Sequence, residues 1–218
     1  MKNTVALLMI MALSTFSYNL TFGQKLNGKG DMVTRTLNVD DFTGISLSVN
    51  GKVYITKGPQ SVKVKGQANI IDNLELDVDK NYWNIEFDRK VRNYKTLEFY
   101  ISMPDVTGLS IAGSGKITSS DTFENIDELR ISIAGSGDID FRGSAEKVKV
   151  SIAGSGDANL EKVTTGEANI SIAGSGDAYI HAREALKVSI AGSGDVHYKG
   201  RPKIKTSIAG SGSIESIE

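Results

Sequence analysis

The chain has 218 residues, a formal net charge of −1 and no cysteine. The lack of cysteine excludes disulfide bonds, thiolate metal sites and cysteine nucleophiles, and with only His181 and His197 a histidine-rich zinc site is not expected. Lysine and arginine are scattered along the sequence and are not grouped with aromatic residues, so a nucleic-acid partner is not expected.

Residues 1–23 have the pattern of a secretory signal peptide. Lys2 supplies a positive end, and the apolar run of residues 5–13 is too short to span a bilayer. A small residue, Gly23, precedes Gln24, where cleavage is expected. The sequence therefore predicts an exported mature chain that works in the periplasm or outside the cell and does not insert into a membrane.

Residues 24–108 contain short runs of alternating apolar and polar residues, which is typical of β-strands. Turn signals such as Lys57-Gly58-Pro59 separate these runs. Asn50-Gly51 stands between two of them and predicts a β-hairpin. The runs that we expect to be strands cover residues 33–39, 45–49, 52–56, 61–65, 74–78, 83–87 and 97–102.

Residues 109–218 are an internal repeat. The hexapeptide Ser-Ile-Ala-Gly-Ser-Gly recurs at spacings of 22, 19, 20, 18 and 18 residues, starting at Ser110, Ser132, Ser151, Ser171, Ser189 and Ser207. Apolar and polar residues alternate through each copy, as in a strand with one buried face, and no useful stretch has helical spacing. This period predicts an all-β fold, a parallel β-helix of six coils. Parallel crossovers are nearly always right-handed, so we expect a right-handed solenoid.

Equivalent residues of successive coils are expected to stack about 4.8 Å apart. The two glycines of each copy are expected where the coil bends and its walls approach, because glycine has no Cβ. Residues 24–108 are then either irregular early coils, which we favour, or a cap, in one continuous domain with residues 109–218. The residues expected to form an internal ladder are Ile111, Ile133, Ile152, Ile172, Ile190 and Ile208.

An aspartate follows Gly-Ser-Gly in four copies, and these residues are expected to stack into a ladder of carboxylates. The first interpretation, which we favour, is that each aspartate accepts a hydrogen bond from backbone N–H at the bend. The second is a calcium site between coils, since this cation prefers oxygen ligands. Calcium is the one cofactor that the sequence suggests. The candidate ligands are Asp138, Asp157, Asp177 and Asp195.

The outward side chains of the repeat are small and are expected to form a flat lattice. Such a face can contact a saccharide, another protein or a second copy of the chain. Alternatively, small residues only let the coil bend or let a neighbouring face pack closely. The candidate binding face consists of Ser132, Ser136, Ser151, Ser155, Ser171, Ser175, Ser189 and Ser193.

No catalytic residue is predicted. The acids of the linking segments, among them Glu161 and Glu167, have different offsets within the repeat, so no pair is specified at the separation that polysaccharide cleavage requires. Trp83, Tyr82 and Tyr94 could stack on a sugar ring, although such residues more often complete a core.

Three parts of the sequence together resemble a known family. They are Gly28-Lys29-Gly30, the segment FTGISLSVNGKVYITKG at residues 42–58, and the serial SIAGSGD motifs. They resemble the bacterial family named putative auto-transporter adhesin, head GIN domain, over roughly residues 31–218. The resemblance implies a right-handed β-helix, export and an adhesive role, and it assigns no catalytic or ligand residues.

The sequence thus predicts an exported, non-enzymatic β-helix that acts as an adhesin or cell-envelope binding scaffold. Its expected partner is a polysaccharide or a protein at the cell surface. One alternative is a carbohydrate-active enzyme, which would show paired acids in a cleft. The other is a self-associating structural module, which would show an exposed apolar last coil around Ile208 and Ile214.

Overall fold

The computed structural model describes residues 25–217, which are almost entirely β-strand. The predicted signal peptide, residues 1–23, lies outside the described residues. Within the described part of the chain, no helix combines the length and the hydrophobicity needed to cross a membrane.

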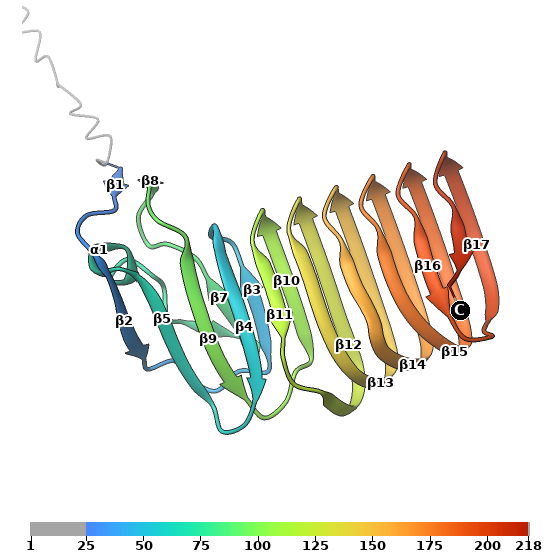
Figure 1. Ribbon diagram of the computed structural model, residues 1–218, viewed down its shortest axis with the longest axis horizontal. Helices are drawn as coiled ribbons and strands as arrows, with labels where there is room; N and C mark the ends of the chain where they lie inside the picture. Colours follow the sequence, from blue (N-terminus) through green and yellow to red (C-terminus); the bar gives the residue numbers. More distant parts are fainter. Residues whose placement is uncertain (1–24, 218) are drawn as a thin grey trace, which may run out of the picture.

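The hexapeptides lie side by side in one parallel sheet, with serine opposite serine and glycine opposite glycine in each pairing. Figure 1 shows these strands stacked along the long axis of the molecule. Each turn runs from one copy to the next, so the six copies delimit about five turns, and the predicted count of six coils is not confirmed. In order of pairing the strands are β10 (Gly108–Gly113), β12 (Phe123–Gly135), β13 (Asp138–Gly154), β14 (Ala158–Gly174), β15 (Ala178–Gly192) and β17 (Lys203–Gly210).

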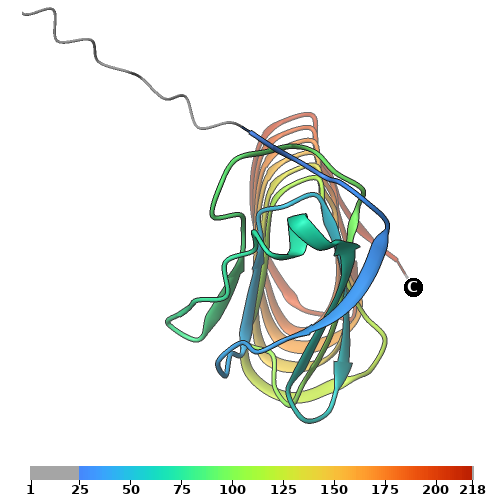
Figure 2. The ribbon, with the colours of Figure 1, turned by 90° about the vertical axis from the view of Figure 1, so that its left-hand side faces the viewer.

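The part of each coil that follows Gly-Ser-Gly stacks in the same way. Strands β13, β14 and β15 continue through it, together with β11 (Lys116–Ser119), β16 (Val196–Lys199) and β18 (Ile214–Ser216). Seen end on in Figure 2, the coils form a flattened tube with two long faces. Gly-Ser-Gly makes the sharp corner between these faces.

Glycine is required at this corner because of both its backbone conformation and its neighbours. Gly174, at the start of one corner, has φ of +139°, a value that residues with a Cβ rarely adopt. A Cβ built there would lie 2.1 Å from the carbonyl oxygen of Gly154 in the preceding coil. That oxygen accepts a hydrogen bond of 2.8 Å from the backbone N–H of Ser175. The corners therefore stack backbone on backbone.

The predicted internal isoleucine ladder is observed. Each of its first five residues is 1 % exposed, whereas Ile208 in the last described coil is 40 % exposed. Ile204 of the same coil is 43 % exposed. Each coil thus buries its apolar side chains only where a neighbouring coil covers them. The five buried members are Ile111, Ile133, Ile152, Ile172 and Ile190.

The parallel stacking continues into the N-terminal part of the chain. Strand β3 (Gly44–Leu47) pairs in parallel with β10 on one side and with β7 (Tyr82–Ile85) on the other. Strand β4 (Gly51–Lys57) pairs in parallel with β11 and with β9 (Leu97–Met103).

The hairpin predicted at Asn50-Gly51 is wrong, because β3 and β4 pair with other strands and not with each other. Ser46 lies opposite Ser110 and Lys52 opposite Lys116. Asn50-Gly51 therefore occupies the place of a Gly-Ser-Gly corner, and residues 46–51 are a degenerate copy of the hexapeptide.

Antiparallel strands end the parallel stack at its N-terminal side. Strand β2 (Met32–Leu37) pairs with β5 (Ser61–Gln67), β5 pairs with β9, and β6 (Val78–Asp79) pairs with β7, all antiparallel. A separate two-stranded sheet joins β1 (Leu26–Asn27) to β8 (Val91–Asn93), and α1 (Ala68–Ile71) follows β5.

Trp83 belongs to the core of this part. It is fully buried between Phe42 and Phe99, with ring centroids 5.7 and 5.9 Å away, and its indole N–H donates to the carbonyl of Glu75. Trp83 is therefore not available to stack on a ligand.

Candidate binding face

The outward side chains of β12, β13, β14, β15 and β17 form one surface, which we call the repeat face. Its side chains alternate with the buried ones and line up in rows across the strands. One row is made of exposed serines and the next of exposed alanines. Of the candidate binding residues, the serine row contains Ser132, Ser151, Ser171 and Ser189.

The other candidate serines lie at the corner, separated from the serine row by the alanines and the first glycine of each copy. They are also exposed, and each donates its backbone N–H to a glycine carbonyl of a preceding coil, over 2.8 to 2.9 Å. The candidate serines thus form two rows and not one patch, and their role in binding stays a prediction. The corner residues are Ser136, Ser155, Ser175 and Ser193.

A basic row lies two residues before the serine row. Register places Arg130, Lys149, Asn169, Lys187 and Lys205 opposite one another on successive strands, so four of its five positions are basic. These residues are far apart in the sequence, which is why the basic row is not seen when composition alone is considered.

A further row, two residues earlier again, contains both signs of charge. Its members, in order of the strands, are Glu128, Lys147, Glu167, Ala185 and Lys203.

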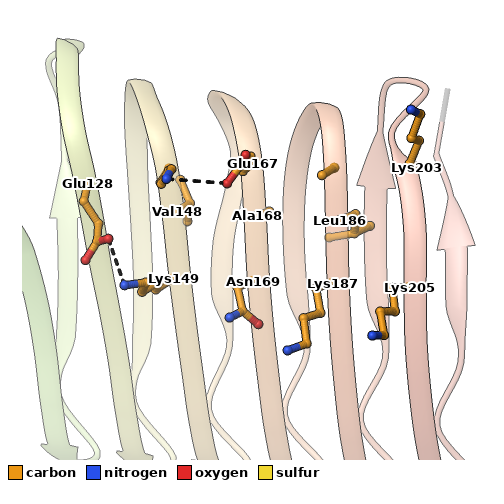
Figure 3. A pocket seen from close by; sticks show the side chains of 12 residues that line it. Glu128, Val148, Lys149, Glu167, Ala168, Asn169, Leu186, Lys187, Lys203 and Lys205 are labelled. Atoms are coloured by element: carbon orange, nitrogen blue, oxygen red, sulfur yellow. Dashed lines mark ion pairs between the residues drawn. The ribbon is translucent and has the colours of Figure 1, made fainter.

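Residues of these rows line two shallow depressions in the repeat face. One, of about 340 Å³, is lined by the mixed row and by the basic row except Arg130, above the buried side chains of Val148, Ala168 and Leu186. The other, of about 260 Å³, shares Lys149 and Asn169 with it and extends to the serine row. Together they form a continuous surface that we call the repeat groove. Figure 3 shows Lys149, Asn169, Lys187 and Lys205 of the groove side by side on β13, β14, β15 and β17.

Ion pairs neutralise one end of the groove. The carboxylate of Glu128 lies 2.6 Å from Arg130 and 2.8 Å from Lys149. The hydrogen bond from Lys149, together with the positive charges of Arg130 and Lys149, holds the pKa of Glu128 below its usual value. Glu167 lies 3.8 Å from Lys147.

The other end of the groove is positive. Within residues 25–217, no carboxylate lies within ion-pairing distance of Lys187, Lys203 or Lys205. The positive potential of the repeat face is therefore concentrated over β15 and β17.

The candidate calcium ligands form a column on the far side of the corner. A carboxylate oxygen of Asp157 accepts the backbone N–H of Asp177 at 2.8 Å, and Asp177 in turn accepts that of Asp195 at 2.8 Å. Asp195 accepts the backbone N–H of Ser213 at 2.6 Å. Three of the four aspartates thus accept a backbone N–H, but the donor lies in the next coil and not at the same bend, as the favoured interpretation had expected.

The described residues contain no cluster of three or more histidine and acidic side chains that could hold a metal ion. Asp138, the first residue of the column, is exposed and lies opposite Lys116. The calcium site stays a prediction.

Two stacked aromatic pairs, which the sequence did not predict, lie on the second long face. The rings of Tyr179 and His197 are 4.7 Å apart, and those of Tyr54 and Tyr100 are 5.3 Å apart. The first pair adjoins the aspartate column, and burial together with the charge of Asp177 raises the pKa of Tyr179. Only the pair of Tyr179 and His197 could have been predicted from the sequence, because both residues stand eight positions after the first serine of their copies.

Comparison with known proteins gives both a family and a fold. The model of the family described as putative auto-transporter adhesin, head GIN domain, matches residues 41–202. Among curated proteins, none is similar enough to match.

Three solved structures are similar to this chain. One, described as a putative adhesin from Bacteroides fragilis, is 24 % identical with a TM-score of 0.72, covering 88 % of this chain and all of that one. A putative adhesin from Parabacteroides merdae is 20 % identical with a TM-score of 0.57, covering 89 % of this chain and 99 % of that one. A putative lipid binding protein from Parabacteroides distasonis is 22 % identical with a TM-score of 0.56, covering 89 % of this chain and all of that one.

The structural likenesses support the β-solenoid, and the family match covers most of the described residues. The chain therefore belongs to the family of putative auto-transporter adhesins with a head GIN domain.

Proposed function

We propose that this chain is an exported, non-enzymatic adhesin that binds an extended polymer at the cell surface through the repeat groove. The observation that carries the proposal is the form of the groove, which is shallow and continuous and crosses successive coils. A small molecule is usually held in a concave pocket that surrounds it. A long shallow groove with repeated polar side chains suits a long ligand with a repeated structure.

The acids of the groove support a non-enzymatic role. Glu128 and Glu167 are two strands apart in their row, which is about 10 Å, and Lys147 stands between them. Each contacts a basic side chain. A glycosidase needs a general acid whose pKa is raised, whereas the pKa of Glu128 is lowered.

Two observations support export. Residues 1–23 have the sequence pattern of a signal peptide. The family is described as putative auto-transporter adhesins, and adhesins act at cell surfaces.

The test is a binding array of polysaccharides and cell-envelope polymers, probed with purified residues 24–218 in calcium and in chelator. The informative variant carries Ser151→Gln and Ser171→Gln, which place two longer neutral side chains in the groove. The matched control carries Thr118→Gln and Asn159→Gln on the second long face. We expect the wild type and the control to bind the same polymer and the groove variant to lose that binding.

Two outcomes would contradict the proposal: no polymer bound by the wild type, or equal loss of binding in both variants. Binding that requires calcium would instead direct attention to the aspartate column, and then Asp177→Asn should abolish it.

Self-association is a second candidate, favoured by the exposure of Ile204 and Ile208 in the last described coil. Sedimentation velocity of the wild type and of an Ile208→Lys variant tests it. A concentration-dependent dimer that Ile208→Lys removes would support association through this coil, and a wild-type monomer at all concentrations would exclude it.

A further inference from the structure

The net charge of −1 conceals a separation of charge between the faces of the molecule. The basic row and the mixed row together hold six basic and two acidic side chains. The column beyond the corner holds four aspartates. A ligand that approaches the repeat groove therefore meets a positive surface, although the protein as a whole is slightly acidic.

The positive charges are also regular. Lys187 and Lys205 lie on neighbouring strands, about 4.8 Å apart, and Lys149 lies two strands before Lys187. From Arg130 to Lys205 the basic row spans about 19 Å along the solenoid axis. One strand spacing is comparable to the length of one sugar ring in a polysaccharide, so a chain with a negative group on its sugars can meet several of these positions at once.

We propose that the repeat groove binds an acidic polysaccharide whose chain runs along the solenoid axis. Its negative groups contact Lys187, Lys203 and Lys205, whose charges no carboxylate of residues 25–217 neutralises. Its hydroxyl groups contact Asn169 and the adjoining serine row. This inference rests on the proposed function and adds the chemical class of the polymer.

The groove fits a polysaccharide better than other polyanions. Among the described residues that line the two depressions, none is aromatic, whereas proteins that bind single-stranded nucleic acids combine a positive groove with aromatic side chains on which the bases stack. The apolar lining residues Val148, Ala168 and Leu186 are buried, so they offer no apolar surface for insertion into a lipid layer. Hydroxyl and amide groups beside lysines match the mixed polar and anionic surface of an acidic sugar chain.

The experiment compares anionic polysaccharides with neutral counterparts. Immobilised polygalacturonate and dextran sulfate are tested beside methyl-esterified polygalacturonate and dextran, with biolayer interferometry of the purified mature chain. A single-stranded oligonucleotide and anionic lipid vesicles are tested in the same way. The groove variant carries Lys187→Gln, Lys203→Gln and Lys205→Gln. The control variant removes the same charge from the second face and the N-terminal strands, through Lys52→Gln, Lys63→Gln and Lys116→Gln. Circular dichroism checks that both variants are folded.

We expect the wild type to bind at least one anionic polymer and to bind its neutral counterpart much more weakly. The groove variant should bind about tenfold more weakly, which is the effect of losing three exposed charge contacts of ordinary strength. The control variant should bind about twofold more weakly at most, since its lysines act only at long range, and added salt should weaken all binding.

Equal binding of anionic and neutral polymers would overturn the inference, as would equal weakening in the groove and control variants. Tighter binding to single-stranded oligonucleotides or to anionic lipid vesicles than to any polysaccharide would also overturn the inference, and it would identify a nucleic acid or a membrane as the partner. If only neutral polymers bind, and Ser151→Gln with Ser171→Gln removes that binding, the proposed function stands without this inference. If no polymer binds at all, both fail.

Discussion

The glycine that opens each corner allows a sharp test of how the coils are held together. We consider Gly174→Ala and Gly113→Ala, because both glycines have positive φ, +139° and +129°, but only one has a close neighbour. A Cβ at Gly174 would lie 2.1 Å from the carbonyl oxygen of Gly154, whereas nothing lies within 4 Å of a Cβ at Gly113. The difference between the two variants therefore isolates the contact between coils.

The structure gives the expected magnitudes. A residue with a Cβ held in this backbone region costs about 1 to 3 kcal/mol, and both variants share that cost. In Gly174→Ala the carbonyl of Gly154 must also move, which disturbs its hydrogen bonds of 2.8 and 3.2 Å from the N–H groups of Ser175 and Gly176. Each such bond contributes about 1 kcal/mol. We therefore expect Gly174→Ala to lower the free energy of unfolding by about 1 to 2 kcal/mol more than Gly113→Ala does.

The assay is urea-induced equilibrium unfolding followed by far-ultraviolet circular dichroism. The signal of Trp83, the single tryptophan, is recorded in parallel, because it reports on the N-terminal part alone. Ser175→Ala, an exposed corner residue, serves as a control and should change stability by no more than about 0.5 kcal/mol. Equal destabilisation by Gly174→Ala and Gly113→Ala would refute the reasoning, since the contact with the preceding coil would then contribute nothing.

Two further predictions concern the core and the second face. Ile152→Ala should destabilise the protein by about 2 to 5 kcal/mol, and Ile208→Ala by clearly less, because Ile152 is 1 % exposed and Ile208 is 40 % exposed. Urea unfolding measures both effects, and equal effects would argue against this account of the ladder. Asp177→Asn keeps the acceptor for the N–H of Asp195 but removes a negative charge beside Tyr179, so the pKa of Tyr179 should fall. NMR of labelled tyrosine rings follows this pKa, and an unchanged value would mean that the charge of Asp177 does not contribute to raising it.

The fold of the repeat could be predicted from the sequence because of its local regularity. Six identical hexapeptides must occupy equivalent places, and alternation within each copy assigns Ile152 inward and Ser151 outward without any knowledge of the neighbours. Parallel stacking then follows, since a coil of about twenty residues cannot bury its apolar side alone. The corner glycines and the isoleucine ladder are consequences of the same pattern.

The basic row was also encoded in the sequence but was not recognised. Arg130, Lys149, Lys187 and Lys205 each stand two residues before the first serine of a copy. They look scattered when charges are counted along the chain, and they become one surface only when the copies are aligned. Their role in binding depends in addition on which of them are neutralised, and that depends on the positions of Glu128 and Glu167.

The sequence by itself determined the period, the inward and outward sides and the position of each corner. Only the tertiary structure decided the pairing outside the repeat, where Asn50-Gly51 turns a corner and not a hairpin because both flanking strands pair with other coils. It also decided the register where coil lengths differ, as between Leu160 and Thr164, where the pairing of β14 with β15 shifts. The physical reason is that identical side chains stacked on one another fix register locally, whereas irregular segments take theirs from strands distant in the sequence.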